Sequence, residues 1–89
     1  MNLTMVNLEN CFNTAYEKRC PFVAVKVKMQ GFEKPEIIIN QLKNVKEKLA
    51  YYQRAYNDDL TLKANPGIKI TGFSYGDSFK DIEDDLLWQ

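Results

Sequence analysis

The chain has 89 residues, enough for one domain around a single hydrophobic core and too few for two. Its 45% hydrophobic and 12% aromatic content predicts a folded globular protein rather than a disordered segment. The formal net charge is zero, from 12 basic and 12 acidic residues, so no global charge draws the chain to nucleic acid or membrane. No apolar run approaches the ~18–20 residues that span a bilayer, and no secretory-type signal is visible, so we expect a cytoplasmic protein with no membrane partner.

The charges and the cysteines are unevenly placed along the chain. Residues 1–56 hold nine Lys/Arg against five Asp/Glu, a difference of +4, and residues 57–89 hold three against seven, a difference of −4. This distribution predicts a dipolar molecule, and either the basic or the acidic pole could contact a partner. The alternative interpretation is a solvated surface that is unevenly charged and binds nothing. The two cysteines, Cys11 and Cys20, are too few for a disulfide framework, and we expect buried or half-buried thiols.

The first predicted element is a helix over residues 7–19. Four apolar or aromatic residues recur at helical spacing and are expected to face inward: Leu8, Phe12, Ala15 and Tyr16. Asn7 is the predicted N-cap, because its side chain can accept from the free N–H groups of the first turn. Pro21 ends the helix, since the residue before a proline avoids helical geometry.

A strand over residues 22–29 follows, in which Val23, Val25, Val27 and Met29 share one face. The other face carries Lys26 and Lys28, which we expect to lie in water. Residues 30–35 form a loop with Phe32 at its tip, and the β-branched run at residues 36–40 predicts the returning strand of a hairpin.

The second helix, over residues 42–57, has the strongest periodicity in the chain. Its expected inward stripe alternates by three and four residues: Leu42, Val45, Leu49, Tyr52 and Tyr56. Successive residues turn by 100°, which places several polar residues and Tyr51 on the opposite side. A stripe of this kind indicates core packing.

The remaining third of the chain predicts a short strand at residues 60–63, a last strand at residues 68–75 and a final helix. Asn65-Pro66-Gly67 predicts a tight turn with glycine at positive φ between the two strands. Gly72 predicts a bulge that turns Phe73 inward. The final helix should be capped by Ser78, and its expected inward residues are Phe79, Ile82 and Leu86, with Trp88 at the edge of the core.

The resulting fold class is α+β, a single domain in the order α-β-β-α-β-α. Two adjacent strands argue against a parallel α/β architecture, so we expect a small, mostly antiparallel sheet of three or four strands with two or three helices. Apolar residues expected to face outward leave a homodimer as an open alternative: Phe22, Ala24, Leu87 and Trp88.

No catalytic or cofactor-binding arrangement is found in the sequence. The chain has no histidine, which removes the commonest general base and metal ligand at neutral pH. Its four glycines do not match the spacing of a phosphate-binding loop, and its acidic clusters do not match a calcium loop. We therefore expect a protein that is not an enzyme, with no metal and no cofactor.

Two candidate contact surfaces combine aromatic and basic residues. The first is the polar face of the second helix: Tyr51, Arg54, Lys43, Lys46 and Glu47. An exposed tyrosine beside arginine is typical of interface anchors, and it could also stack on a base while lysines meet phosphates. A tyrosine lying flat over its helical neighbours is the structural alternative. The second candidate is the hairpin, with Phe32 at its tip and Lys26 and Lys28 nearby.

The whole chain is similar in style to small orphan proteins carried by phages and prophages of low-GC Gram-positive bacteria. The similarity lies in the Lys/Asn/Ile-rich, Ala-poor composition and in the segments KPEIIIN at residues 34–40 and LAYYQRAY at residues 49–56. It implies a stand-alone accessory protein that binds and inhibits or modulates a host or phage protein, for example a host defence nuclease. Two alternatives remain: nucleic-acid binding through the basic N-terminal two-thirds, not favoured at zero net charge, and sequestration of a small nucleotide by an oligomer.

Overall fold

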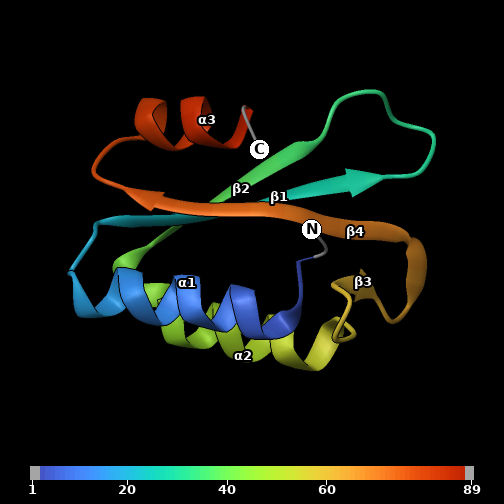
Figure 1. Cartoon of the computed structure of the whole chain (residues 1–89), viewed down its shortest axis with the longest axis horizontal. Coiled ribbons are helices and arrows are strands. Elements are labelled where there is room, and N and C mark those ends of the chain that lie inside the picture. Colours follow the sequence, from blue (N-terminus) through green and yellow to red (C-terminus); the bar gives the residue numbers. More distant parts are fainter. Residues whose placement is uncertain (1–2, 88–89) are drawn as a thin grey trace.

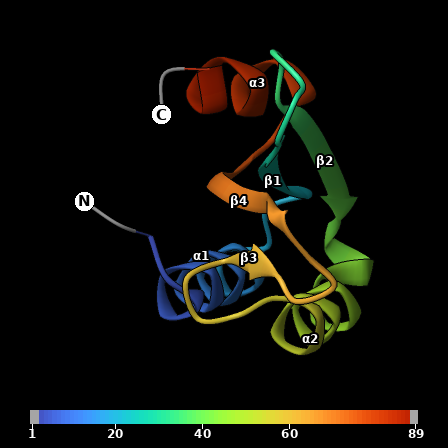
Figure 2. The ribbon, with the colours of Figure 1, turned by 90° about the vertical axis from the view of Figure 1, so that its right-hand side faces the viewer.

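The computed structural model describes residues 3–87, which form one sheet with helices on both faces (Figure 1). The sheet has four antiparallel strands in the order β2-β1-β4-β3. The strands are β1 (Phe22–Met29), β2 (Glu36–Gln41), β3 (Thr61–Leu62) and β4 (Asn65–Gly76). Helices α1 (Met5–Glu17) and α2 (Val45–Ala55) cover one face, and α3 (Phe79–Leu87) covers part of the other (Figure 2). The predicted α+β class, element order and antiparallel sheet are confirmed. The short strand predicted at residues 60–63 is present as β3.

The main core lies between the sheet and helices α1 and α2. Alternation along β1 sends Val23, Val25 and Val27 into it, as the strand pattern predicts. Phe12 of α1 meets Tyr52 of α2 edge-on, with ring centres 5.8 Å apart. The α2 stripe is also confirmed, since Val45, Tyr52 and Tyr56 are buried. None of the helices within residues 3–87 has the length and apolar character to cross a bilayer.

The start of α1 differs from the sequence prediction. The helix begins at Met5 and its N-cap is Thr4, so Asn7 occupies the third helical position and is not the cap. The Asn7 Oδ1 atom accepts from the Thr4 backbone N–H at 2.8 Å and from the Thr4 hydroxyl at 3.0 Å. The prediction that Asn7 is the N-cap is therefore wrong: its side chain takes the second position of a capping box that starts at Thr4.

The predicted turn at Asn65-Pro66-Gly67 is also wrong. The chain reverses at residues 63–64, where Leu62 pairs with Asn65, and β4 begins at Asn65 itself. Gly67 does not have a positive φ, and its N–H donates to Asn65 Oδ1 at 3.0 Å. The bulge near Gly72 is confirmed: the register between β1 and β4 shifts there, and Phe73 packs against the main core.

Helix α3 forms a second, smaller core with the opposite face of the sheet, and its cluster contains Ala24, Ile82 and Leu86. Ala24 is fully buried and Phe22 is half-buried with its ring 4.7 Å from that of Phe79, so the outward-facing role expected of this β1 face is wrong. Phe79, expected inward, is 55% exposed. The prediction for Trp88 lies outside the described residues.

Two polar contacts fix α3 to the sheet. Lys26 Nζ donates to the Leu86 carbonyl oxygen at 3.0 Å, which places a cation at the negative C-terminal end of the helix. The Ser74 hydroxyl donates to the Asp85 carboxylate at 2.5 Å. Lys26 is half-buried, so its predicted position in water is wrong. The predicted Ser78 cap is confirmed by the bond from the Asp81 N–H to Ser78 Oγ, 3.2 Å long.

Candidate functional site

The outer surface of α1 and α2 combines aromatic and basic side chains. We call it the two-helix face and define it by Tyr16, Arg19, Lys43, Lys46, Glu47, Lys48, Tyr51 and Arg54, all of which are exposed. The two helices run antiparallel, because Gln53 Nε2 donates to Glu9 Oε2 at 2.6 Å while Lys46 lies over Tyr16. Gln53 and Lys46 therefore mark the flank of α2 that faces α1.

Tyr16 is the centre of the basic end of this face. Lys46 Nζ lies 4.7 Å from the centre of its ring, and the Arg19 guanidinium carbon lies 5.8 Å from it. Both distances are within the range of cation–π attraction, which holds the two cations beside the aromatic surface. Next to them, Lys18 Nζ is 3.3 Å from the Tyr75 hydroxyl oxygen. The end of α1 and the start of α2 thus form one cationic–aromatic cluster.

Tyr51 lies on the other flank of α2. Its side chain is 45% exposed, and its ring rests edge-on against buried Tyr52 with ring centres 5.4 Å apart. Lys48 Nζ stands 5.9 Å from the Tyr51 ring centre. Successive residues of a helix are rotated by 100° about its axis, so the Tyr51 side chain points about 150° away from the side chains of Lys46 and Gln53. The ring is thus supported from below and accessible from outside.

Within the described part of the chain, the cations of the two-helix face are not held in ion pairs. Among residues 3–87, none of Arg19, Lys43, Lys46, Lys48 and Arg54 forms an ion pair with a carboxylate. A lysine or arginine outside an ion pair keeps its charge available to an incoming anion, at the ordinary strength of a solvated surface charge, and Glu47 is the one acidic residue in the definition of this face. This face therefore presents positive charge and aromatic surface together.

The structure brings together the five residues predicted on the second helix and adds three that the sequence prediction missed. Tyr16 was expected in the core, yet it is 37% exposed: its neighbour Ala15 is fully buried, while Tyr16 lies on the flank of α1 that faces Lys46 of α2. Arg19 and Lys48 were missed although each lies only three residues from its tyrosine, Tyr16 and Tyr51, a spacing that brings side chains together on a helix. The run Tyr16-Glu17-Lys18-Arg19 was the available signal, an aromatic residue followed closely by cations.

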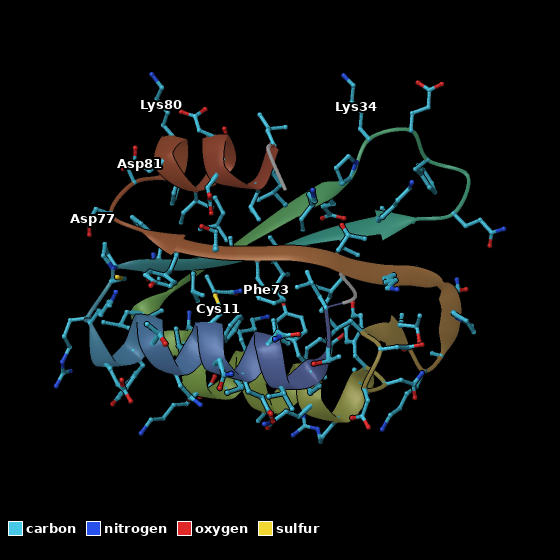
Figure 3. All side chains as sticks on the ribbon, in the orientation of Figure 1. Cys11, Lys34, Phe73, Asp77, Lys80 and Asp81 are labelled. Atoms are coloured by element: carbon cyan, nitrogen blue, oxygen red, sulfur yellow. The ribbon has the colours of Figure 1, made fainter. Side chains whose placement is uncertain are left out.

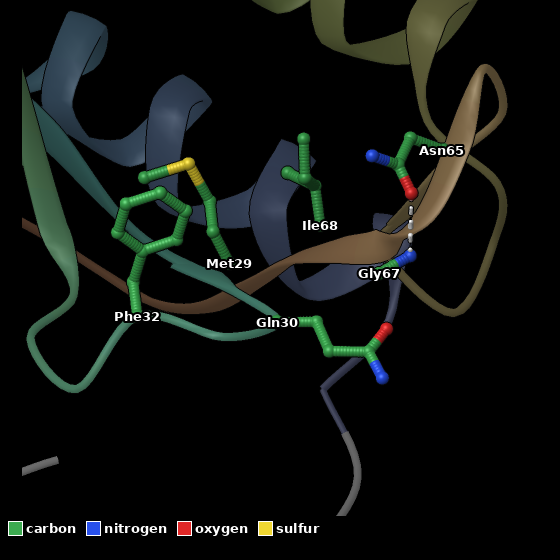
Figure 4. A pocket seen from close by; sticks show the side chains of 6 residues that line it. All are labelled: Met29, Gln30, Phe32, Asn65, Gly67 and Ile68. Carbon is green, nitrogen blue, oxygen red and sulfur yellow. Dashed lines mark hydrogen bonds between the residues drawn. The ribbon is translucent and has the colours of Figure 1, made fainter.

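The hairpin residues do not form a second site. Lys26 is engaged with α3, and Lys28 is exposed directly opposite Lys69 on β4, beside a shallow hollow of about 320 Å³. Phe32 is 62% exposed. With Met29 it borders a different hollow of about 240 Å³ that extends to Asn65 and Gly67 (Figure 4). Lys26, Lys28 and Phe32 therefore lie in three different environments and are not gathered into one site.

Two groups in the main core, Cys11 and Tyr52, are held in their protonated states. Burial, assisted by the negative charge of Asp85, raises the pKa of the Cys11 thiol to about 12, so the thiol stays protonated at neutral pH. Cys11 and Phe73 both lie between α1 and the sheet (Figure 3). Burial raises the pKa of Tyr52 to about 12 as well. Within the described part of the chain, no three His, Cys, Asp or Glu side chains gather to hold a metal ion.

Comparison with known proteins adds no relative to this description. Neither a protein-family model, nor a curated protein, nor a solved structure matches the chain.

Proposed function

We propose that this protein is a non-enzymatic binding module and that its two-helix face docks onto an acidic surface of another protein. The observation that carries the proposal is the pairing of two exposed tyrosines, Tyr16 and Tyr51, with lysine ammonium groups 4.7 and 5.9 Å from their ring centres. The nearby cations have no carboxylate partners among residues 3–87. Tyrosine and arginine supply much of the binding energy of protein interfaces.

The face suits a protein partner because its anchors are held in place before contact. Tyr51 is supported by Tyr52, and Tyr16 is flanked by Lys46 and Arg19. Groups fixed on helices lose little side-chain entropy when they bind. Positive charge on this face speeds the approach of an acidic surface, although the whole chain is neutral.

A binding role follows from the chemistry of the chain and from its resemblance. A chain without histidine, whose Cys11 thiol stays protonated, has no activated nucleophile or general base in view. The similarity in style to phage and prophage accessory proteins directs the search for the partner to a bacterial host, with inhibition of a defence nuclease as one outcome.

The test is affinity capture from a host lysate followed by calorimetry with the purified partner. Tyr51→Ala and Lys46→Glu should each weaken binding about 30-fold or more, since loss of an interface anchor typically costs about 2 kcal/mol. Lys80→Glu is the matched control: it makes the same charge change on exposed α3, across the sheet from the two-helix face (Figure 3). Equal affinity for wild type, Tyr51→Ala and Lys46→Glu would disprove the assignment of this face.

Nucleic acid and small nucleotides are the competing ligands. Binding to single-stranded DNA or RNA through stacked tyrosines should weaken steeply with salt and should be lost in Lys46→Glu. A nucleotide ligand at a hundred times its dissociation constant should stabilise the fold by about 2.7 kcal/mol. If either is observed and no protein is captured, the protein-binding proposal is wrong.

A further inference from the structure

The two outer edges of the sheet differ in how well they are protected. The edge at β3 is only two residues long, its register with β4 shifts between Thr61 and Leu62, and Pro66 lies beside it. Short length, irregular register and proline are the usual devices that stop a sheet edge from pairing with another chain. The edge at β3 itself is therefore blocked, although β3 pairs with β4 only as far as Lys69 and leaves the rest of β4 on that side without a strand among residues 3–87.

The edge at β2 is longer and regular, with Lys34 and Pro35 only before the start of the strand. Glu36–Gln41 pairs with β1 in unbroken register from Gln41 opposite Phe22 to Glu36 opposite Val27. The strand contains no lysine, arginine or proline. Among residues 3–87, no other segment pairs with its outer edge, which lies open on the side of the molecule away from β4 (Figure 2). A row of backbone N–H and C=O groups is thus left without a strand partner.

The side chains on β2 are apolar on both faces of the sheet. Ile37 and Ile39 pack against the α3-side cluster, and Ile38 packs against the main core. All three isoleucines are only half-buried, because no neighbouring strand covers their outer sides. A strand added at this edge would cover apolar surface on both faces and satisfy the free backbone groups at once.

We propose that the strand added at this edge is β2 of a second copy, antiparallel, so that two four-stranded sheets join into one of eight strands. Along a strand, the N–H and C=O groups of every second residue point to the same edge. In an antiparallel pair, two residues that lie opposite each other both point their groups towards the partner strand or both point them away, so their numbers must both be even or both be odd and add to an even number. A two-fold axis at Ile38 satisfies this rule. It places Ile38 opposite Ile38 of the second copy and Ile37 opposite Ile39 of the second copy.

The charges of β2 also fit a second copy. The strand has one charged residue, Glu36, and this register places it opposite the neutral Asn40 of the second copy. No like charges face each other across the seam, where they would destabilise the pair. The whole chain has zero net charge, so two copies do not repel each other at a distance. This association uses no residue of the two-helix face and goes beyond the proposed function.

The first experiment is sedimentation equilibrium of the full chain from about 1 to 500 µM. The mass should rise from that of the 10.4 kDa chain to twice that value and no further, because two-fold pairing of β2 closes the assembly. Ile38→Lys places two lysines opposite each other at the axis and should weaken the dimer at least 10-fold. The control Thr61→Lys makes a similar change at the blocked β3 edge and should leave the dimer unchanged.

A cross-link tests the register and does not depend on how well Ile38→Lys folds. In a Cys11→Ala, Cys20→Ser background, Ile38→Cys should form a disulfide-linked dimer under mild oxidation, since the axis brings the two residues together. Glu36→Cys should not, since its partner is Asn40. A wild-type chain that stays monomeric at 500 µM, a mass that grows beyond the dimer, or a cross-link that forms faster at Glu36→Cys would each overturn the proposal.

Discussion

Replacing Asn40 with valine should make the protein more stable, although it removes a polar group from the native strand. Asn40 is 6% exposed, and its Nδ2 donor is buried with no hydrogen-bond partner. A hydrogen bond from the Asn40 amide lowers the pKa of Tyr52 against the larger effect of burial, but the geometry between the two side chains is too poor to satisfy Nδ2. A buried donor that lost its water and gained no partner works against folding.

The size of the effect follows from two terms. An unsatisfied buried polar group typically costs about 1–3 kcal/mol, and valine recovers most of this because it has no polar atom. Valine is also preferred over asparagine in strands, on a scale that spans about 1 kcal/mol. Repacking against Tyr52 takes back part of the gain. We expect Asn40→Val to raise the free energy of unfolding by about 1–2 kcal/mol, and Tm by about 5–15 °C for a domain of this length.

The assay is urea unfolding followed by circular dichroism, at two protein concentrations because association at β2 would add apparent stability. Gln41→Val, an exposed site on the same strand, is the control for strand preference alone and should change the free energy of unfolding by less than about 0.5 kcal/mol. If Asn40→Val is less stable than wild type while Gln41→Val is neutral, the Asn40 amide is hydrogen-bonded in solution and this reasoning fails.

Two further outcomes concern titration and the attachment of α3. The pKa values of Cys11 and Tyr52 are raised in the folded state, from 9.0 and 10.0 to about 12, so the folded protein holds these protons more tightly than the unfolded chain. The stability contributed by these two groups should therefore be constant below about pH 9 and fall between pH 9 and 12, with a shallower fall in Cys11→Ala; an identical alkaline profile would contradict the burial of this thiol. Lys26→Met removes the charged donor to the Leu86 carbonyl and should lower stability by about 1–2 kcal/mol. In hydrogen exchange, α3 amides should open faster in Lys26→Met than in the exposed control Lys28→Met, and equal rates would refute the anchoring role.

The elements that could be predicted from sequence are those whose pattern is local. The bounds of β1 are the predicted ones, because valines alternating with other residues fix a strand and Pro21 fixes where it starts. The stripe of α2 was equally clear, since five residues spaced by three and four can share a face only in a helix. In both cases the neighbours of a residue in the chain are also its neighbours in the fold.

The wrong predictions depend on contacts between distant parts of the chain. Lys26 looked like a solvent-exposed lysine because its partner, the Leu86 carbonyl, lies 60 residues away and exists only once α3 has docked. Asn65-Pro66-Gly67 has turn composition, yet pairing of β4 with β1 extends the segment and moves the reversal to residues 63–64. Tyr16 has helical spacing but lies at the edge of the buried stripe of α1, on the flank towards Lys46 of α2, while its neighbour Ala15 is fully buried. Periodicity alone does not show how wide the buried stripe of a helix is.

The two proposals together predict how this protein engages a partner. A two-fold axis through paired β2 strands runs perpendicular to the sheet, so both copies would present α1 and α2 on the same side. Helix α2 lies beneath β2, and Tyr51 points to the flank of α2 away from α1 (Figure 2). The Tyr51 side chains of the two copies would therefore lie near the paired β2 strands. Such a dimer is bivalent towards a repeated or two-fold acidic surface.

Bivalency has a measurable consequence that neither proposal has alone. Ile38→Lys should leave the one-to-one affinity for a monomeric partner in solution unchanged, because the two-helix face is intact. On a surface densely coated with partner, wild type should bind at least 100-fold more tightly than Ile38→Lys, since the second contact is then intramolecular. On a sparsely coated surface the two proteins should bind alike. A difference between them that persists at sparse coating would mean that β2 contacts the partner directly, and the dimer would then be the wrong reading of the open edge.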